Sequence, residues 1–181
     1  MFAALILASC LALALADTPC TPPQTVIYWK SPCDGQTFSN RITPTNVTIM
    51  QAGQLVDARG GLDLELPINI VSSIVNNYGE TTKPLVDMGI YEYSSAKGAP
   101  CSWKALPTFG LLGNIDACTM IENCHMTGIP TTLVANVDVK AIAGPLLHLV
   151  TKDAFYGLTL TFKDKDAPLV CVYIQDRVHN V

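Results

Sequence analysis

The sequence predicts an all-β fold in which two antiparallel sheets form a sandwich. Short segments rich in β-branched and aromatic residues, or alternating between apolar and polar residues, recur along the chain. Clusters of Gly, Pro, Asn and Asp separate these segments, and no long segment carries a helical period. Roughly seven or eight short strands with turns between them are typical of a sandwich.

The first strands are expected at residues 24–30 (QTVIYWK) and 45–51 (TNVTIMQ), on either side of a turn at 31–35. In the second strand, Val47 and Ile49 fall on one face, and Asn46 falls on the other. A glycan on Asn46 would have to point to water. We therefore expect Val47 and Ile49 to point inward.

A third strand is expected at residues 62–66, where leucines alternate strictly with carboxylates. This period of two places Leu62, Leu64 and Leu66 inward and Asp63 and Glu65 outward. The segment that follows, residues 68–77, is ambiguous between strand and other structures.

The second half of the chain contains the longest apolar alternations. Residues 84–93 and 131–139 are expected to be strands, and 155–163 and 169–178 are expected to form a hairpin. Residues 141–150 read either as a short helix interrupted at Gly144-Pro145 or as an apolar loop. The inward faces of the strands at 84–93 and 131–139 are expected to contain Val86, Met88, Ile90, Leu133, Ala135, Val137 and Val139.

Residues 1–16 (MFAALILASCLALALA) are apolar and end in a small-x-small pattern, which predicts a cleaved signal peptide. The alternative is a transmembrane anchor, but the run is shorter than the roughly 18 apolar residues that an anchor needs. We therefore expect residues 17–181 to form a single secreted domain.

Removal of the signal peptide would take Cys10 away and leave six of the seven cysteines. An even number of cysteines in a secreted chain predicts disulfides rather than free thiols. Asn46 begins the sequence Asn-Val-Thr, an acceptor site for N-glycosylation in the secretory route. The remaining six cysteines are Cys20, Cys33, Cys101, Cys118, Cys124 and Cys171.

Composition and motifs favour binding over catalysis. The net charge is −4 and no basic patch is present, so a nucleic-acid partner is not expected. No nucleophile with a matching base, no metalloprotease motif and no phosphate loop is found, so we expect neither an enzyme nor a cofactor. Cys118, Cys124 and His125 suggest zinc, but they lack paired C-x-x-C halves, and a disulfide hairpin is the favoured interpretation.

The segment from Cys101 to Cys118 holds an apolar run, residues 106–112, that contains Pro and Gly. Such a run is unusual for a core strand and for a surface loop. It predicts a bent apolar loop anchored by cysteines at both ends. We expect Phe109, Leu111 and Leu112 to border an entrance to the interior, with Trp103 close behind.

The order of these features resembles the ML (lipid-recognition) domain family, most closely its secreted nematode members. The resemblance covers most of the mature chain. It is carried by Cys20 before the first strand, Cys33 after it, the pattern Asp116-Ala-Cys118 with Glu122-Asn-Cys124, and Val170-Cys171-Val172 in the last strand. The strand at residues 158–162 fits as well, whereas His125 stands where the family usually has Pro.

Members of this family are immunoglobulin-like sandwiches that hold a lipid between their sheets. The resemblance implies pairing of Cys20 with Cys171 and of Cys118 with Cys124, which leaves Cys33 and Cys101 for each other. The sterol carrier of this family instead closes its early cysteine onto a near neighbour, and this chain has none there.

Two functions follow. The first is a secreted or lysosomal monomer that binds or transfers a lipid and contacts membranes or a receptor only transiently. The second is a secreted interaction module that uses the apolar loop as a contact patch and has a solid core. The residues alone favour a solid core, and the resemblance favours a cavity. The expected lipid-binding residues are Leu64, Leu66, Val86, Met88, Ile90, Trp103, Phe109, Leu111, Leu112, Val137, Leu158 and Leu160.

Overall fold

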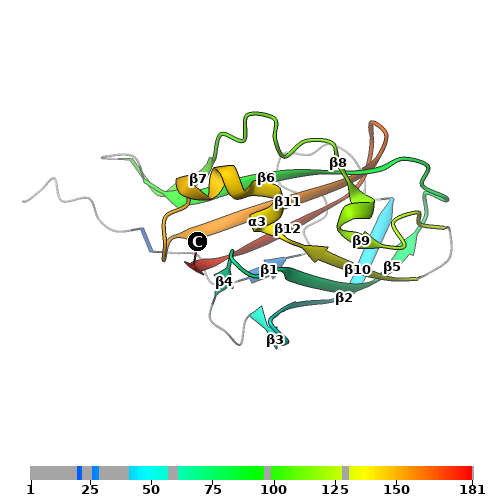
Figure 1. Cartoon of the computed structure of the whole chain (residues 1–181), viewed down its shortest axis with the longest axis horizontal. Coiled ribbons are helices and arrows are strands. Elements are labelled where there is room, and N and C mark those ends of the chain that lie inside the picture. The colour runs from blue at the N-terminus through cyan, green and yellow to red at the C-terminus, as the bar shows by residue number, and fades with distance from the viewer. Residues whose placement is uncertain are drawn as a thin grey trace, which may run out of the picture.

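The structure, a computed structural model, describes residues 20–21, 26–28, 41–56, 61–95, 99–127 and 131–180. These residues form two β-sheets that pack face to face (Figure 1). The predicted all-β, two-sheet sandwich is therefore confirmed. The signal peptide predicted at residues 1–16, the ends of the strand predicted at 24–30, and Cys33 lie outside the described residues.

Sheet A follows the order β1 (Val26–Tyr28), β12 (Ala167–Asn180), β11 (Phe155–Asp164), β6 (Pro84–Ser94) and β7 (Ser102–Ala105), with β4 (Leu62–Asp63) beside β12 and β8 (Ile115–Asp116) beside β6. Sheet B follows the order β3 (Gln54–Leu55), β2 (Ile42–Gln51), β5 (Ile68–Asn76), β10 (Thr131–Val137) and β9 (Ile121–Glu122). Among the described strands, every pair is antiparallel except β4 and β12, which run parallel.

The ambiguous segment after residue 67 is the central strand of sheet B, β5. Its side chains alternate between buried and more exposed along the whole strand. The alternation is mixed in polarity, because Ser72 and Asn76 point inward with the isoleucines and are buried. Inward polar residues are what made the period hard to see in the sequence.

Strand β2 contains a bulge at Asn46. The register with β5 shifts between Thr45 and Thr48, and Asn46 takes a φ of 50°, a left-handed conformation that Asn tolerates. The Ser72 hydroxyl donates a hydrogen bond of 3.0 Å to the Thr45 carbonyl at this bulge. Asn46 is exposed and Ile49 is buried, as the alternation predicted, so a glycan at Asn46 would have access to solvent.

The strand predicted at residues 62–66 is wrong beyond its second residue. Strand β4 ends at Asp63, and the chain then turns, with the Asp63 carboxylate accepting from the Glu65 N–H. The Gln51 side chain fixes this turn by hydrogen bonds to the backbone of Asp63 and Leu66. Leu66 is consequently half-buried at a turn and does not lie in an inward strand row.

The segment after β10 is helical, so the helix alternative was the right one. Strand β10 ends at Val137, two residues before the predicted end, because the Asp138 side chain caps the helix α3 (Val139–Ala143). A 3₁₀-helix, η2 (Gly144–Leu149), continues from it with Pro145 in its first turn. Within the described residues, no helix has the length and apolar character needed to cross a membrane.

The disulfides confirm one predicted pair and overturn two. Cys118 bonds Cys124, as predicted. Cys20 bonds Cys101, with a Cα–Cα distance of 5.7 Å, so the predicted pairs Cys20–Cys171 and Cys33–Cys101 are wrong. Cys101 directly precedes β7, which lies three strand positions from β12, or roughly 14 Å at ~4.8 Å per position, so a Cys20 bonded to Cys101 is too far from Cys171 in β12 to bond it. Cys171 is disulfide-bonded as well.

Candidate functional site

The candidate site is an apolar cavity between the two sheets. Strand alternation turns one face of each sheet toward the other, and these inward rows are mostly apolar. The cavity has a volume of about 60 Å³, and every residue of its lining is apolar. Its lining consists of Ile42, Pro44, Ile70, Ile74, Val86, Met120, Ile121, Leu133, Ala135, Val137, Leu160, Phe162, Val170 and Val172.

A second, smaller cavity of about 30 Å³ lies further along the same interior. Helix α3 and the turn after β4 contribute to it through Val139 and Leu64. The one hydroxyl in its lining, on Tyr156, already accepts from the Thr151 N–H at 2.7 Å and donates to Glu92 at 3.3 Å. Its lining consists of Leu62, Leu64, Ile68, Ile90, Val139, Val150, Tyr156, Gly157, Leu158, Ile174 and Val178.

Burial of the phenol is the main cause that raises the pKa of Tyr156 above its ordinary value of 10.0. Tyr156 therefore stays neutral at physiological pH, and the interior that it faces carries no charge from this group. Such an interior suits hydrocarbon and disfavours an ionised ligand group.

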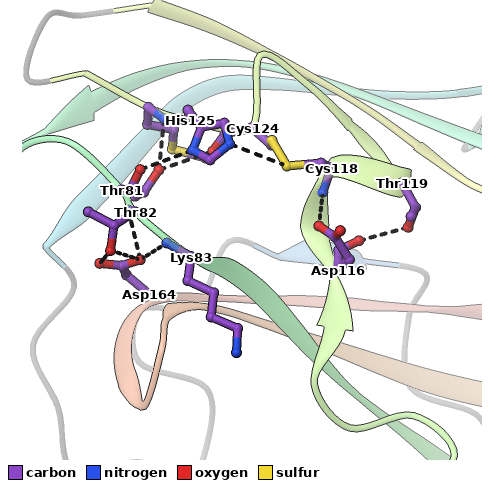
Figure 2. Close-up of a disulfide and its surroundings, with 10 residues drawn as sticks. Thr81, Thr82, Lys83, Asp116, Cys118, Thr119, Cys124, His125 and Asp164 are labelled. Carbon is purple, nitrogen blue, oxygen red and sulfur yellow. Dashed lines mark hydrogen bonds between the residues drawn. A yellow bond between two sulfur atoms is a disulfide. The ribbon is translucent and has the colours of Figure 1, made fainter.

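The disulfide hairpin Cys118–Cys124 supplies one wall of the larger cavity, through Met120 and Ile121. A short 3₁₀-helix, η1 (Ala117–Thr119), starts the hairpin, and the Asp116 carboxylate accepts from the Cys118 N–H at 2.9 Å (Figure 2). The hairpin is thus held at its start by a cap and at its base by a covalent bond.

His125 joins this hairpin to the loop before β6. Its Nδ1 lies 3.1 Å from the Thr81 carbonyl, and its Nε2 lies 3.9 Å from the Cys118 sulfur (Figure 2). The two cysteine sulfurs are bonded to each other, and a zinc site would need them as thiolates. The disulfide interpretation is therefore confirmed and the zinc interpretation is wrong.

A buried carboxylate closes the sandwich just beyond the larger cavity. Asp164, at the end of β11, is 5% exposed and accepts hydrogen bonds from the backbone N–H groups of Thr82 and Lys83 (Figure 2). The hydroxyls of Tyr78 and Thr82 donate to it as well. Burial raises the pKa of Asp164, but the bonds from Lys83 and Thr82 outweigh burial and hold the pKa below its ordinary value of 3.8. Asp164 therefore stays ionised and fixes the 78–83 loop.

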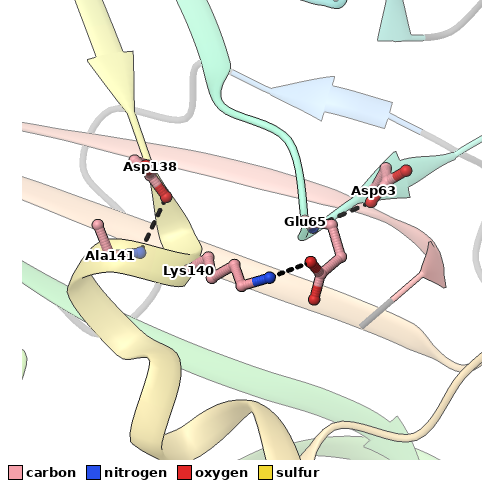
Figure 3. A network of polar contacts seen from close by, with 5 residues as sticks. All are labelled: Asp63, Glu65, Asp138, Lys140 and Ala141. Atoms are coloured by element: carbon pink, nitrogen blue, oxygen red, sulfur yellow. Dashed lines mark hydrogen bonds and ion pairs between the residues drawn. The ribbon is translucent and has the colours of Figure 1, made fainter.

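At the other end, an exposed ion pair lies over the smaller cavity. Lys140 of α3 contacts Glu65 of the turn after β4, and each of them directly follows a residue that lines the cavity (Figure 3). The hydrogen bond with Glu65 is the main cause that raises the pKa of Lys140. The Asp138 cap, which accepts from Ala141 at 2.8 Å, fixes the start of the same helix.

Six of the predicted lipid-binding residues line these cavities. Val86, Val137 and Leu160 line the larger cavity, and Leu64, Ile90 and Leu158 line the smaller one. Met88 and Leu112 are buried in the surrounding core, and neither cavity has them or Leu66 in its lining.

The predicted entrance residues lie elsewhere. Phe109 is 79% exposed and Leu111 is 55% exposed, at the tip of the loop between β7 and β8, and neither lines a cavity. Trp103 pairs with Tyr93 across β7 and β6, on the opposite face of sheet A from Ile90. Its ring packs there against Tyr93 and Tyr173, with centroids 5.1 and 6.1 Å away, so Trp103 does not lie behind an entrance.

Most of the cavity lining from sheet B was not predicted. Ile70 and Ile74 lie on the strand whose character was ambiguous, and Met120 and Ile121 lie in a hairpin that was considered only for its cysteines. Phe162 alternates with polar residues and could have been identified from the sequence, whereas Val170 and Val172 lie between apolar neighbours and could not.

Comparison with known proteins gives no relative to guide the assignment. No protein-family model matches the chain, and no curated protein shows significant similarity to it. The case for a function therefore depends on the geometry of the interior.

Proposed function

We propose that this protein is a secreted lipid carrier that holds the hydrocarbon part of a lipid between its two sheets. The observation that supports the proposal is the larger cavity, whose lining is wholly apolar and comes from both sheets. Protein interiors are normally packed as densely as organic crystals. An apolar void of this kind stays dry and accepts apolar ligands.

Other features agree with this proposal. The chain resembles a lipid-recognition family, whose hairpin disulfide Cys118–Cys124 is present here, although the Cys20–Cys101 pair departs from that resemblance. Disulfides are compatible with an extracellular or lysosomal location. The proposed role is binding without catalysis or cofactor, by a monomer.

Native mass spectrometry of the protein purified from its host tests the proposal. A co-purified lipid that extraction with organic solvent releases is the expected result. Ala135→Leu places three extra carbons in the larger cavity, so retention of lipid should fall by about tenfold or more while the fold stays intact. Ala105→Leu, at an exposed position on β7, is the matched control. A lipid-free mass for the wild type, with an equally stable fold, would exclude the proposal.

The exposed loop supports a second candidate, contact with a membrane surface. Phe109 adopts a φ of 51°, a left-handed conformation that costs an L-residue roughly 1–2 kcal/mol. The loop is nevertheless anchored on both sides by β6, which binds Leu106 and Leu112 through backbone hydrogen bonds. The loop therefore presents two apolar side chains to solvent on a fixed support.

Flotation with phosphatidylcholine vesicles tests this candidate. Leu111→Asp should lower the vesicle-bound fraction, because a charge cannot enter the apolar layer without a large desolvation cost. The fold should survive, since Leu111 is exposed. Leu55→Asp, at an exposed leucine on β3, is the matched control and should bind vesicles like the wild type. Equal binding by all three proteins would exclude the loop as a membrane contact.

A further inference from the structure

The two cavities occupy neighbouring positions along the same strands. On the inner face of β11, Phe162 and Leu160 line the larger cavity, and Leu158 and Tyr156 line the smaller one. Strand β12 repeats this order, with Val172 in the larger cavity and Ile174 in the smaller. The cavities are thus successive sections of one inter-sheet layer.

The strand register of sheet A shows how close the sections lie. Leu160 is the direct partner of Val172, and both line the larger cavity. The next inward row, Leu158 with Ile174, lines the smaller cavity. Successive inward rows are roughly 7 Å apart, the length of two residues in a strand. No row intervenes between the sections.

Sheet B gives the same result within a single row. Val137 and Ile68 are direct partners across β10 and β5, so their side chains leave the sheet side by side. Val137 lines the larger cavity and Ile68 lines the smaller one. The boundary between the cavities therefore runs between the side chains of one cross-strand pair.

The separating side chains are apolar, and one is flexible. Met88 is the partner of Leu160 on β6, between Val86 of the larger cavity and Ile90 of the smaller one. Methionine is unbranched and adapts its shape by rotation about three bonds. A shift of its side chain would open a path between the sections without moving a strand.

We infer that the ligand is a lipid with one long, flexible hydrocarbon chain that runs through both cavities. This inference rests on the proposed lipid-carrier function. A rigid fused-ring lipid needs one uninterrupted space, whereas a flexible chain passes between side chains that rotate aside. From Phe162 to Tyr156 the row spans six residues, about 20 Å, which is long enough for an extended acyl chain. The hydroxyl of Tyr156 already has its hydrogen bonds, so the part of the smaller cavity at Tyr156 receives the methyl end of the lipid chain and not its polar group.

Binding of saturated fatty acids of increasing chain length tests the inference in the wild-type protein. Displacement of a fluorescent fatty acid, with cholesterol as the rigid competitor, measures the affinities. Each methylene that enters the interior should tighten binding by about fourfold, which is equivalent to ~0.8 kcal/mol. The increase should continue into the long-chain range, and cholesterol should compete poorly.

A matched pair of variants locates the chain. Leu64 and Leu133 are both half-buried leucines, one in the lining of each cavity. Leu64→Trp fills the smaller cavity, so it should weaken long chains by about tenfold or more and leave short chains unchanged. Leu133→Trp should weaken all chain lengths. Thermal melts check folding, and Ile90→Phe replaces Leu64→Trp if that variant does not fold.

The outcomes separate the two hypotheses. If no fatty acid and no cholesterol binds, both the inference and the proposed function are wrong. If lipids bind but affinity stops rising at medium chain length, or if Leu64→Trp leaves long-chain affinity unchanged, only the inference is wrong. Tighter binding of cholesterol than of long fatty acids would likewise overturn the flexible chain and keep the carrier function.

Discussion

The two ends of the sandwich are each closed by a charged contact, but the two contacts differ in burial. Asp164 beyond the larger cavity is 5% exposed, and it accepts hydrogen bonds from two backbone N–H groups and two hydroxyls. Over the smaller cavity, the side chains of Lys140 and Glu65 are 57% and 41% exposed. A carboxylate thus closes one end from within, and an ion pair lies across the other end in solvent.

This difference decides how much each contact contributes. Removal of a buried acceptor leaves its donors without a hydrogen-bond partner, and hydrogen bonds to charged groups are among the stronger ones. An exposed ion pair replaces contacts that each charge would otherwise make with water, and salt screens the attraction between the two charges. We therefore expect the end at Asp164 to resist opening and the end at Lys140 to depend on apolar packing.

Replacement of Asp164 should have the largest effect. Asp164→Ala leaves the N–H groups of Thr82 and Lys83 without their acceptor and should lower the free energy of unfolding by about 2 kcal/mol. For a domain of this size the melting temperature should fall by roughly 4–8 °C. Asp166→Ala, at an exposed position in the same turn, is the control and should melt like the wild type. Equal melting of both variants would show that water replaces the carboxylate without cost.

Acid should weaken the same contact by a smaller and graded amount. The pKa of Asp164 is lower in the folded state than in the unfolded state, so the unfolded state binds the proton more readily. The stabilisation is complete above the unfolded value, about 3.9, and is lost as pH falls through the folded pKa. The contact should therefore persist at the endosomal pH of about 5–6.

Urea titrations of the wild type and Asp164→Asn over a series of pH values measure this dependence. When the pH falls from above to below about 4, the free energy of unfolding should decrease more for the wild type than for Asp164→Asn. Asp164→Asn keeps a carbonyl acceptor but has no proton to gain at this position. Parallel pH profiles for the two proteins would assign acid unfolding to other carboxylates.

The sequence predicted the strands better than it predicted the ends of the sandwich. Val86, Met88 and Ile90 recur at every second residue of one strand, as Leu158 and Leu160 do in another, and that local period is enough to place them inward. Asp164 gives no such signal, because its partners are 81 and 82 residues away in the chain. In the sequence it reads as an ordinary turn residue.

The same limit explains the wrong strand at residues 62–66 and the cavity lining that was not predicted. The strand predicted at Leu62–Leu66 stops at Asp63 because Gln51, a distant residue, binds the backbone of the turn. Alternation shows which way a side chain points, but whether an interior is filled depends on the volumes that both sheets and the hairpin contribute together. Met120 enters that volume from a hairpin whose apolar residues carry no strand period.

The smallest effect is expected at the exposed ion pair. Lys140→Ala removes the contact with Glu65, yet the melting temperature should stay within the error of the measurement, because surface pairs contribute little. Lys152→Ala, at an exposed lysine outside the pair, controls for the change in net charge. The cover of the smaller cavity should stay in place, since Val139, Ala143, Leu146 and Leu147 remain buried beneath it. A clear drop in melting temperature for Lys140→Ala but not for Lys152→Ala would show instead that the ion pair holds this end closed. In that case, high salt should remove the difference in melting temperature between the wild type and Lys140→Ala. The two ends would then differ in burial and not in strength.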